Sequence, residues 1–80
     1  MESDRINILS WNISGLENKL GDQEWESYIF KYEICAFQET WALSEVTMNG
    51  YMSFHVPARR SSSGRPSGGL ALWINTCLLT

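Results

Sequence analysis

The chain has 80 residues, a length that allows one small domain. Hydrophobic residues make up 44% of it and include four tryptophans, which excludes disorder along most of the chain. The formal net charge is −3, no run of eighteen apolar residues occurs, and the beginning is charged. The sequence therefore predicts neither a membrane span nor a signal peptide. The two cysteines have no metal-ligand or disulfide spacing, so we expect reduced thiols in an intracellular protein.

The first half of the chain predicts a strand, a helix and a second strand. We expect residues 1–5 to form a frayed N-terminus, and the apolar run 6–11 predicts the first strand. Asn, Ser and Gly residues in 12–20 predict a loop. The apolar run 34–37 predicts the second strand. A strand, a helix and a strand within about 35 residues form a crossover, so the two strands should pair in parallel.

Asp22 predicts the start of the intervening helix, because its carboxylate can accept hydrogen bonds from the first free backbone amides. Trp25, Ile29 and Tyr32 are spaced by four and three residues and therefore share one helical face. We expect this aromatic face to pack on the sheet.

The second half predicts two more strands. Pro57 ends the apolar run 51–56, as expected for a strand followed by a residue without an N–H donor. Residues 58–67 are rich in Ser, Arg and Gly and predict a flexible loop. The run 69–74 predicts a strand that pairs with 51–56 as a hairpin. Because an apolar tail follows it up to Thr80, we expect a chain cut from something larger.

One polar side chain follows each of the first two predicted strands. Asn12 comes at the end of the first strand and Glu39 at the end of the second. Ligands of open α/β sheets collect at the carboxyl ends of strands, where an amide and a carboxylate can bind a phosphate and its divalent metal. The competing interpretations are a turn-forming asparagine and a solvated carboxylate. Gln38 should point to the opposite face from Glu39 and is expected to be structural.

The positive charges of the second half gather in its predicted loop. Arg59, Arg60 and Arg65 lie there, and residues 46–80 contain no acid. Three arginines in a loop can make weak, salt-sensitive contacts with the phosphates of a nucleic acid. A solvated hairpin loop is the competing interpretation.

Three strings occur in an order typical of one enzyme superfamily. They are Ile8-Leu9-Ser10-Trp11-Asn12-Ile13-Ser14-Gly15-Leu16, Phe37-Gln38-Glu39-Thr40-Trp41 and Ser67-Gly68-Gly69-Leu70-Ala71-Leu72-Trp73-Ile74. With these strings the sequence resembles the N-terminal part of the endonuclease/exonuclease/phosphatase superfamily, which has the DNase I-like fold. Within it, the chain is similar to the apurinic-type endonuclease domain of LINE-type (non-LTR) retrotransposons. The resemblance implies an α/β fold in which residues 6–80 form part of a four-layer α/β/β/α sandwich, a β-α-β unit followed by a β-hairpin.

The resemblance also implies a site. By position, Glu39 matches the metal-binding glutamate of the family and Asn12 its active-site asparagine, with Mg²⁺ or Mn²⁺ as cofactor and DNA as substrate. The family further uses a Tyr, an Asp-x-Asn pair and an Asp-His pair that lie beyond residue 80. His55, the one histidine of the chain, does not match the catalytic histidine and is expected to be structural. We therefore expect the 80 residues alone to bind metal weakly or not at all and to be inactive.

Two other readings remain open at this point. The chain can be a non-enzymatic remnant or interaction module that self-associates through an exposed sheet face. It can also belong to a phosphatase, phospholipase or RNA nuclease branch of the superfamily. The retrotransposon resemblance implies a nuclear or cytoplasmic location.

Overall fold

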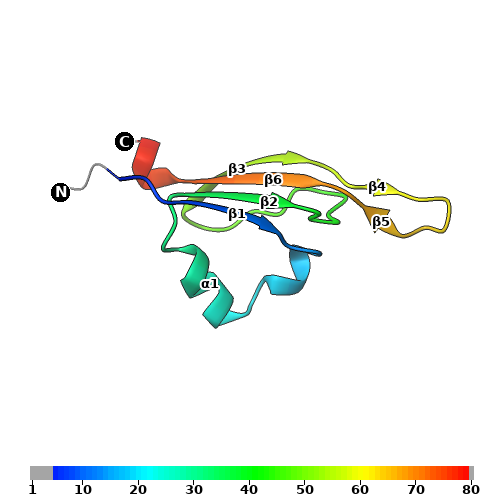
Figure 1. Ribbon diagram of the computed structural model, residues 1–80, viewed down its shortest axis with the longest axis horizontal. Helices are drawn as coiled ribbons and strands as arrows, with labels where there is room; N and C mark the ends of the chain where they lie inside the picture. Colours follow the sequence, from blue (N-terminus) through cyan, green and yellow to red (C-terminus); the bar gives the residue numbers. More distant parts are fainter. Residues whose placement is uncertain (1–4, 80) are drawn as a thin grey trace.

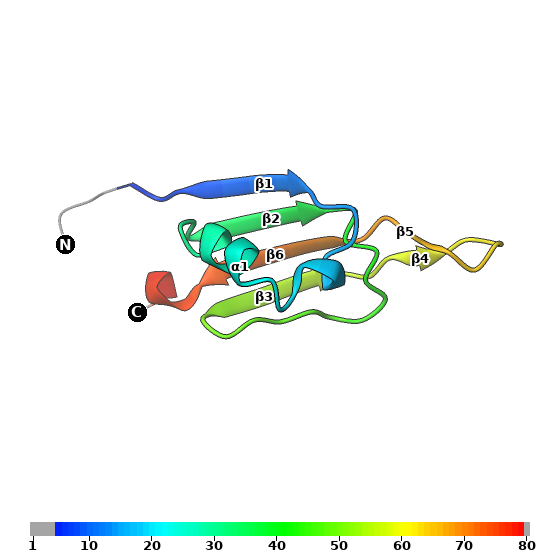
Figure 2. The same cartoon turned by 90° about the horizontal axis from the view of Figure 1, so that it is seen from below.

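The computed structural model describes residues 5–79, which form a small mixed α/β domain. A four-stranded sheet carries the short helix α1 on one face (Figures 1 and 2). Of the segment 1–5, which was expected to be frayed, only Arg5 lies within the described residues. No helix between residues 5 and 79 is long and apolar enough to cross a membrane. The elements of the sheet and helix are β1 (Ile8–Asn12), α1 (Gln23–Ile29), β2 (Ile34–Gln38), β3 (Tyr51–Val56) and β6 (Leu70–Asn75).

The strand order is β1-β2-β6-β3. β1 and β2 pair in parallel, as the predicted crossover requires, and β3 and β6 form the predicted antiparallel pair. β6 also pairs antiparallel with β2, so the last strand in the sequence occupies an interior position. The predicted strands and their pairings are confirmed.

The helix begins as predicted and ends earlier. Asp22 Oδ1 accepts hydrogen bonds from the amides of Glu24 (3.0 Å) and Trp25 (3.2 Å), which confirms the N-cap. The helix ends at Ile29, so the placement of Tyr32 on its last turn was wrong. The hydroxyl of Tyr51, in β3, lies 2.9 Å from the Ile29 carbonyl oxygen and 3.0 Å from that of Tyr32. The Tyr51 hydroxyl thus donates hydrogen bonds to carbonyl oxygens that would accept backbone amides if the helix were longer.

The predicted loops contain more structure than expected. Part of 58–67 forms a two-stranded antiparallel ribbon, β4 (Arg59–Arg60) with β5 (Pro66–Ser67), so its description as a flexible loop was wrong there. A 3₁₀ turn, η1 (Glu17–Lys19), interrupts the first loop, and another, η2 (Thr76–Leu79), follows β6. In Figure 1 the ribbon extends past the carboxyl ends of β1 and β2.

The core lies between α1 and one face of the sheet. Trp73 is fully buried at its centre, where its ring meets Phe37 edge to face with ring centroids 5.2 Å apart. Trp25 reaches the same rings from the helix, 5.9 Å from Phe37 and 6.4 Å from Trp73. This aromatic cluster confirms that the helical face of Trp25 and Ile29 packs on the sheet.

Two ionisable groups of this core predict how stability depends on pH. Burial raises the pKa of the Tyr51 hydroxyl and that of the Cys35 thiol above their ordinary values. Both groups are therefore neutral in the folded chain, and their contribution to stability is complete below the pKa values of the unfolded chain, about 8.5 for Cys and about 10 for Tyr. The contribution is lost as the pH rises from the unfolded-state pKa towards the folded-state pKa, by up to about 1.4 kcal/mol per pH unit for each group.

We expect the urea midpoint to be level between pH 7 and 8 and to fall between pH 9 and 11.5. The Tyr51→Phe variant should be less stable at neutral pH, having lost the hydroxyl contacts, and should lose less of its remaining stability above pH 10. Equal losses in both proteins over this interval would contradict the assignment to Tyr51.

Candidate functional site

The parallel strands β1 and β2 end side by side and stay connected beyond their ends. Asn12 is paired with Gln38 across the two strands. Past this pair, the amides of Ile13, Gly15 and Leu16 donate to the carbonyl oxygens of Gln38, Glu39 and Thr40 at 2.9, 3.0 and 2.9 Å. The two predicted site residues, Asn12 and Glu39, are therefore brought to one edge of the sheet on adjacent segments.

Glu39 is held in an uncommon conformation. Its φ is +55°, in the left-handed region that few residues other than glycine, asparagine and aspartate enter. Trp41, two residues later, has a φ of +57°. Between them Thr40 is buried, and its amide donates to the Gly69 carbonyl oxygen at 3.2 Å. Such strained backbone costs of order 1–3 kcal/mol per residue and gathers at functional sites.

Two donors fix the Glu39 carboxylate. The indole Nε1 of Trp41 donates to Oε1 at 3.0 Å, and the amide of Gly68 donates to the same oxygen at 3.3 Å. From residues 5–79 no N–H or O–H group donates to Oε2. One oxygen of the half-buried carboxylate is thus fixed and the other is open to a ligand. The competing interpretation, a freely solvated carboxylate, does not describe Glu39.

Asn12 is exposed at the end of β1, and its side-chain oxygen accepts a long hydrogen bond of 3.4 Å from the Ser14 hydroxyl. Ser14 itself has a φ of +51°. The Asn12 amide nitrogen has no protein acceptor within residues 5–79. This group is therefore able to donate a hydrogen bond to a phosphate oxygen.

Gln38 has the structural role expected of it. Its amide nitrogen donates to the Ser10 hydroxyl and to the Ala36 carbonyl oxygen, both at 3.2 Å, and so joins β1 to β2. His55 lies on β3, which β2 and β6 separate from β1. The fold does not bring His55 to Asn12.

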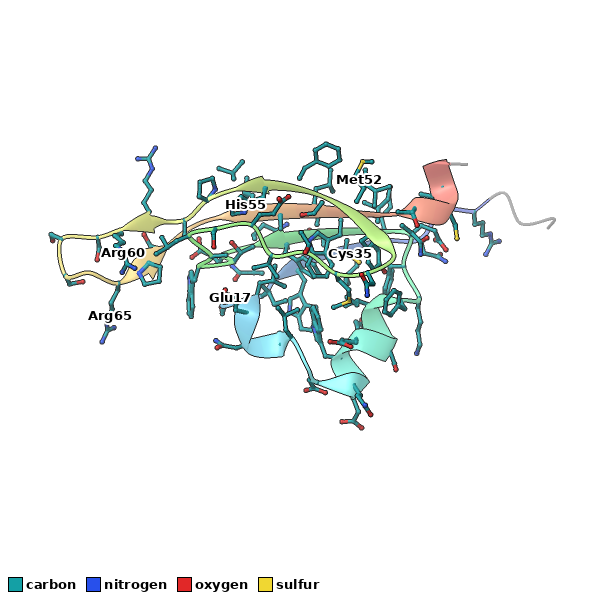
Figure 3. The ribbon with its side chains drawn as sticks, turned by 180° about the vertical axis from the view of Figure 1, so that it is seen from behind. Glu17, Cys35, Met52, His55, Arg60 and Arg65 are labelled. Atoms are coloured by element: carbon teal, nitrogen blue, oxygen red, sulfur yellow. The ribbon has the colours of Figure 1, made fainter. Side chains whose placement is uncertain are left out.

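The arginines lie on the β4–β5 ribbon, and all three are exposed. Arg59 and Arg60 form β4, and Arg65 directly precedes β5. The Arg60 guanidinium donates to the Gly64 carbonyl oxygen at 2.9 Å, which closes the tip of the ribbon. In Figure 3 the Arg65 side chain extends from the ribbon on the side where the helix lies. The ribbon continues into Gly68, whose amide binds Glu39, so the basic segment and the carboxylate are physically connected.

Metal ligands are few at this edge. Among the described residues no group of three or more His, Cys, Asp or Glu side chains could hold a metal ion. A cage of protein ligands therefore does not exist in residues 5–79. Mg²⁺ keeps several waters and uses one or two carboxylates together with substrate phosphates, and the open oxygen of Glu39 fits this mode of binding.

Sequence reasoning missed Trp41 as a part of the site. Of this residue 39% is exposed, and its indole N–H donates to the Glu39 carboxylate. A tryptophan two residues after a candidate carboxylate was the available signal. Gly68 has no such signal, because it contributes only its backbone amide.

A scan against protein-family models finds no family that matches this chain, and a search of curated proteins finds no match.

Proposed function

We propose that the chain carries the N-terminal part of the active site of a Mg²⁺-dependent phosphodiesterase, a DNA endonuclease of the retrotransposon type. The observation that carries this proposal is the Glu39 carboxylate, held in left-handed backbone with one oxygen fixed by Trp41 and Gly68. Asn12 lies on the adjacent segment.

In this proposal each residue has one task. Glu39 Oε2 would hold Mg²⁺, and a bound Mg²⁺ would supply positive charge against the negative charge that develops on the phosphate. The Asn12 amide donates to a phosphate oxygen and orients it. The three arginines contact neighbouring phosphates of the backbone, which positions the nucleic acid without reading its sequence.

The proposed fold is the α/β half of a four-layer sandwich. The sheet has α1 on one face only, and its other face is apolar, as expected of a layer that a second sheet covers. A base that activates water and further metal ligands are supplied by residues outside these 80. The 80-residue chain therefore holds a binding site and is not a complete catalyst.

Paramagnetic broadening by Mn²⁺ tests the metal site directly. We expect amide signals of residues 12–15 and 39–41 to broaden first when Mn²⁺ is added to the ¹⁵N-labelled chain, with a dissociation constant in the millimolar range. Glu39→Gln removes the charge and should abolish this local broadening. Glu45→Gln changes an exposed carboxylate in the segment between β2 and β3 and is the matched control.

Nicking of supercoiled plasmid is the second readout. With 5 mM Mg²⁺ we expect no nicking above background by the wild-type chain or by Glu39→Gln. Nicking that disappears in Glu39→Gln would overturn the statement that the site is incomplete. Broadening that is equal in wild type and Glu39→Gln, or strongest elsewhere, would overturn the metal site itself.

A further inference from the structure

The tip of the β4–β5 ribbon is a serine turn that projects from the sheet. The amide of Gly64 donates to the Ser61 carbonyl oxygen at 2.9 Å, which closes a β-turn with Ser62 and Ser63 at its two central positions. The hydroxyls of Ser61 and Ser63 lie 2.7 Å apart and are hydrogen-bonded to each other. The Ser62 hydroxyl has no hydrogen-bond partner within residues 5–79. In Figure 2 this turn forms the end of the domain opposite to η2.

The ribbon tip can also open without disturbing the core. Every residue from 59 to 65 is exposed, and the nearest buried residue before them is Ala58. The strands β4 and β5 have only two residues each. Opening the turn therefore exposes no buried apolar surface, and segments of this kind open at a small fraction of the global free energy of unfolding. An enzyme that binds its substrate as an extended peptide can thus reach Ser62.

The charges beside Ser62 indicate which kind of enzyme would bind here. Arg59 and Arg60 stand three and two residues before it, and no other serine or threonine of the chain has an arginine at both positions. The Arg59 guanidinium has no hydrogen-bond or ion-pair partner within residues 5–79. Arginines form strong charge-assisted hydrogen bonds with carboxylates, so the complementary partner has an acidic substrate groove. Such a groove is the recognition device of basophilic serine/threonine protein kinases.

We propose that Ser62 is a phosphorylation site for a basophilic serine/threonine protein kinase, with ATP as the phosphoryl donor. The Ser62 hydroxyl oxygen forms a bond to the γ-phosphorus of ATP while the bond from this phosphorus to the oxygen bridging to the β-phosphate breaks. ADP leaves, and the serine proton passes to the catalytic carboxylate of the kinase. The carboxylates of the kinase groove bind Arg59 and Arg60.

A phosphate on Ser62 changes what the ribbon can bind. Residues 59–65 contain three arginines and no acid. Phosphoserine has a charge of about −1.5 to −2 at pH 7 and three acceptor oxygens that pair with arginine, so most of this positive charge is cancelled. The modified ribbon therefore makes fewer contacts with nucleic-acid phosphates. This consequence rests on the proposed function, whereas the modification itself does not.

Incubation of the chain with Mg²⁺, ATP and the catalytic subunit of a cyclic AMP-dependent protein kinase, followed by mass spectrometry, tests the site. We expect one phosphate, located on Ser62. Ser62→Ala should abolish it, and Ser44→Ala, an exposed serine outside the ribbon, should not. Arg59→Gln removes one charge-assisted contact and should lower kcat/KM of the kinase at least about 10-fold. Lys31→Gln, an equal change of charge at an exposed residue of the helix side, is the matched control.

A wild-type chain that stays unmodified, a phosphate on another residue, or an unchanged kcat/KM for Arg59→Gln overturns the site. Fluorescence anisotropy of a labelled DNA duplex tests the consequence. We expect the phosphorylated chain to bind the duplex at least about 10-fold more weakly than the unmodified chain, and equal binding overturns the consequence. If the unmodified chain does not bind the duplex, the proposed arginine contacts and the consequence both fail, while the mass spectrum still decides whether Ser62 is a site.

Discussion

The Trp73→Ala variant is expected to lose about 3–5 kcal/mol of stability, a large part of the total. Trp73 is fully buried and contacts Trp25, Phe37 and Tyr51, with ring centroids 6.4, 5.2 and 5.6 Å away. Removing a buried tryptophan costs about 3–5 kcal/mol, and an 80-residue chain has about 4–12 kcal/mol of stability in total. We expect the near-ultraviolet circular dichroism of the variant to be weakened and its urea midpoint to lie far below that of the wild type.

Trp73→Phe is the matched control. The indole Nε1 of Trp73 is buried and has no hydrogen-bond partner within residues 5–79. An unsatisfied buried donor costs about 1–3 kcal/mol, and phenylalanine does not carry it. Removal of this donor offsets the packing contacts that are lost with the smaller ring. We therefore expect the free energy of unfolding of Trp73→Phe to lie within about 1.5 kcal/mol of that of the wild type. A cooperative transition of wild-type midpoint in Trp73→Ala would show that Trp73 is not central to the core.

The Gly69→Ala variant is expected to lose about 3–5 kcal/mol, through backbone strain and overpacking together. Gly69 has a φ of +96°, and a Cβ at this position would overlap the Thr40 hydroxyl oxygen and lie 3.3 Å from Ala58 Cβ. Thr40 is buried, and its hydroxyl oxygen accepts the Ala42 amide at 3.3 Å, so the threonine has little room to move. Equilibrium denaturation in urea measures the loss.

The Gly68→Ala variant separates the effect of backbone strain from the effect of steric overlap with Thr40. Gly68 has a φ of +74°, and no atom lies within 4 Å of a Cβ placed there. This variant carries the strain alone and should lose about 1–2 kcal/mol. Equal losses at the two glycines would contradict the close approach of Gly69 to Thr40. We further expect the Mn²⁺ response near Glu39 to weaken in Gly69→Ala, because Thr40 is the neighbour of Glu39.

The sequence predicted which strands pair and not how the two pairs join. The crossover fixed β1 beside β2, and the hairpin fixed β3 beside β6. Either strand of the hairpin could have met the free edge of β2. A signal for β6 was present, since Leu70–Ile74 is apolar at every position and interior strands have continuous apolar runs.

The candidate site was predicted in its residues and not in its geometry. Asn12 and Glu39 were singled out because they end strands, and the pairing of β1 with β2 brings their segments together. The left-handed backbone at Glu39 and Trp41 has no sequence signal, because neither residue type favours it. It arises from contacts with Gly68 and Gly69, roughly thirty residues later in the sequence. Local propensity does not contain information about such contacts.

The interior position of β6 has a consequence for synthesis of the chain. β1 and β2 emerge first, but the free edge of β2 has no partner until β6 is made roughly thirty residues later. At 5–20 residues per second, this delay lasts about 2 to 6 s. During it, nascent chains display an unpaired strand edge and aromatic side chains that Trp73 later covers. The sheet is therefore complete only when β6, which ends at Asn75, has been made, that is, when nearly the whole chain has been synthesised.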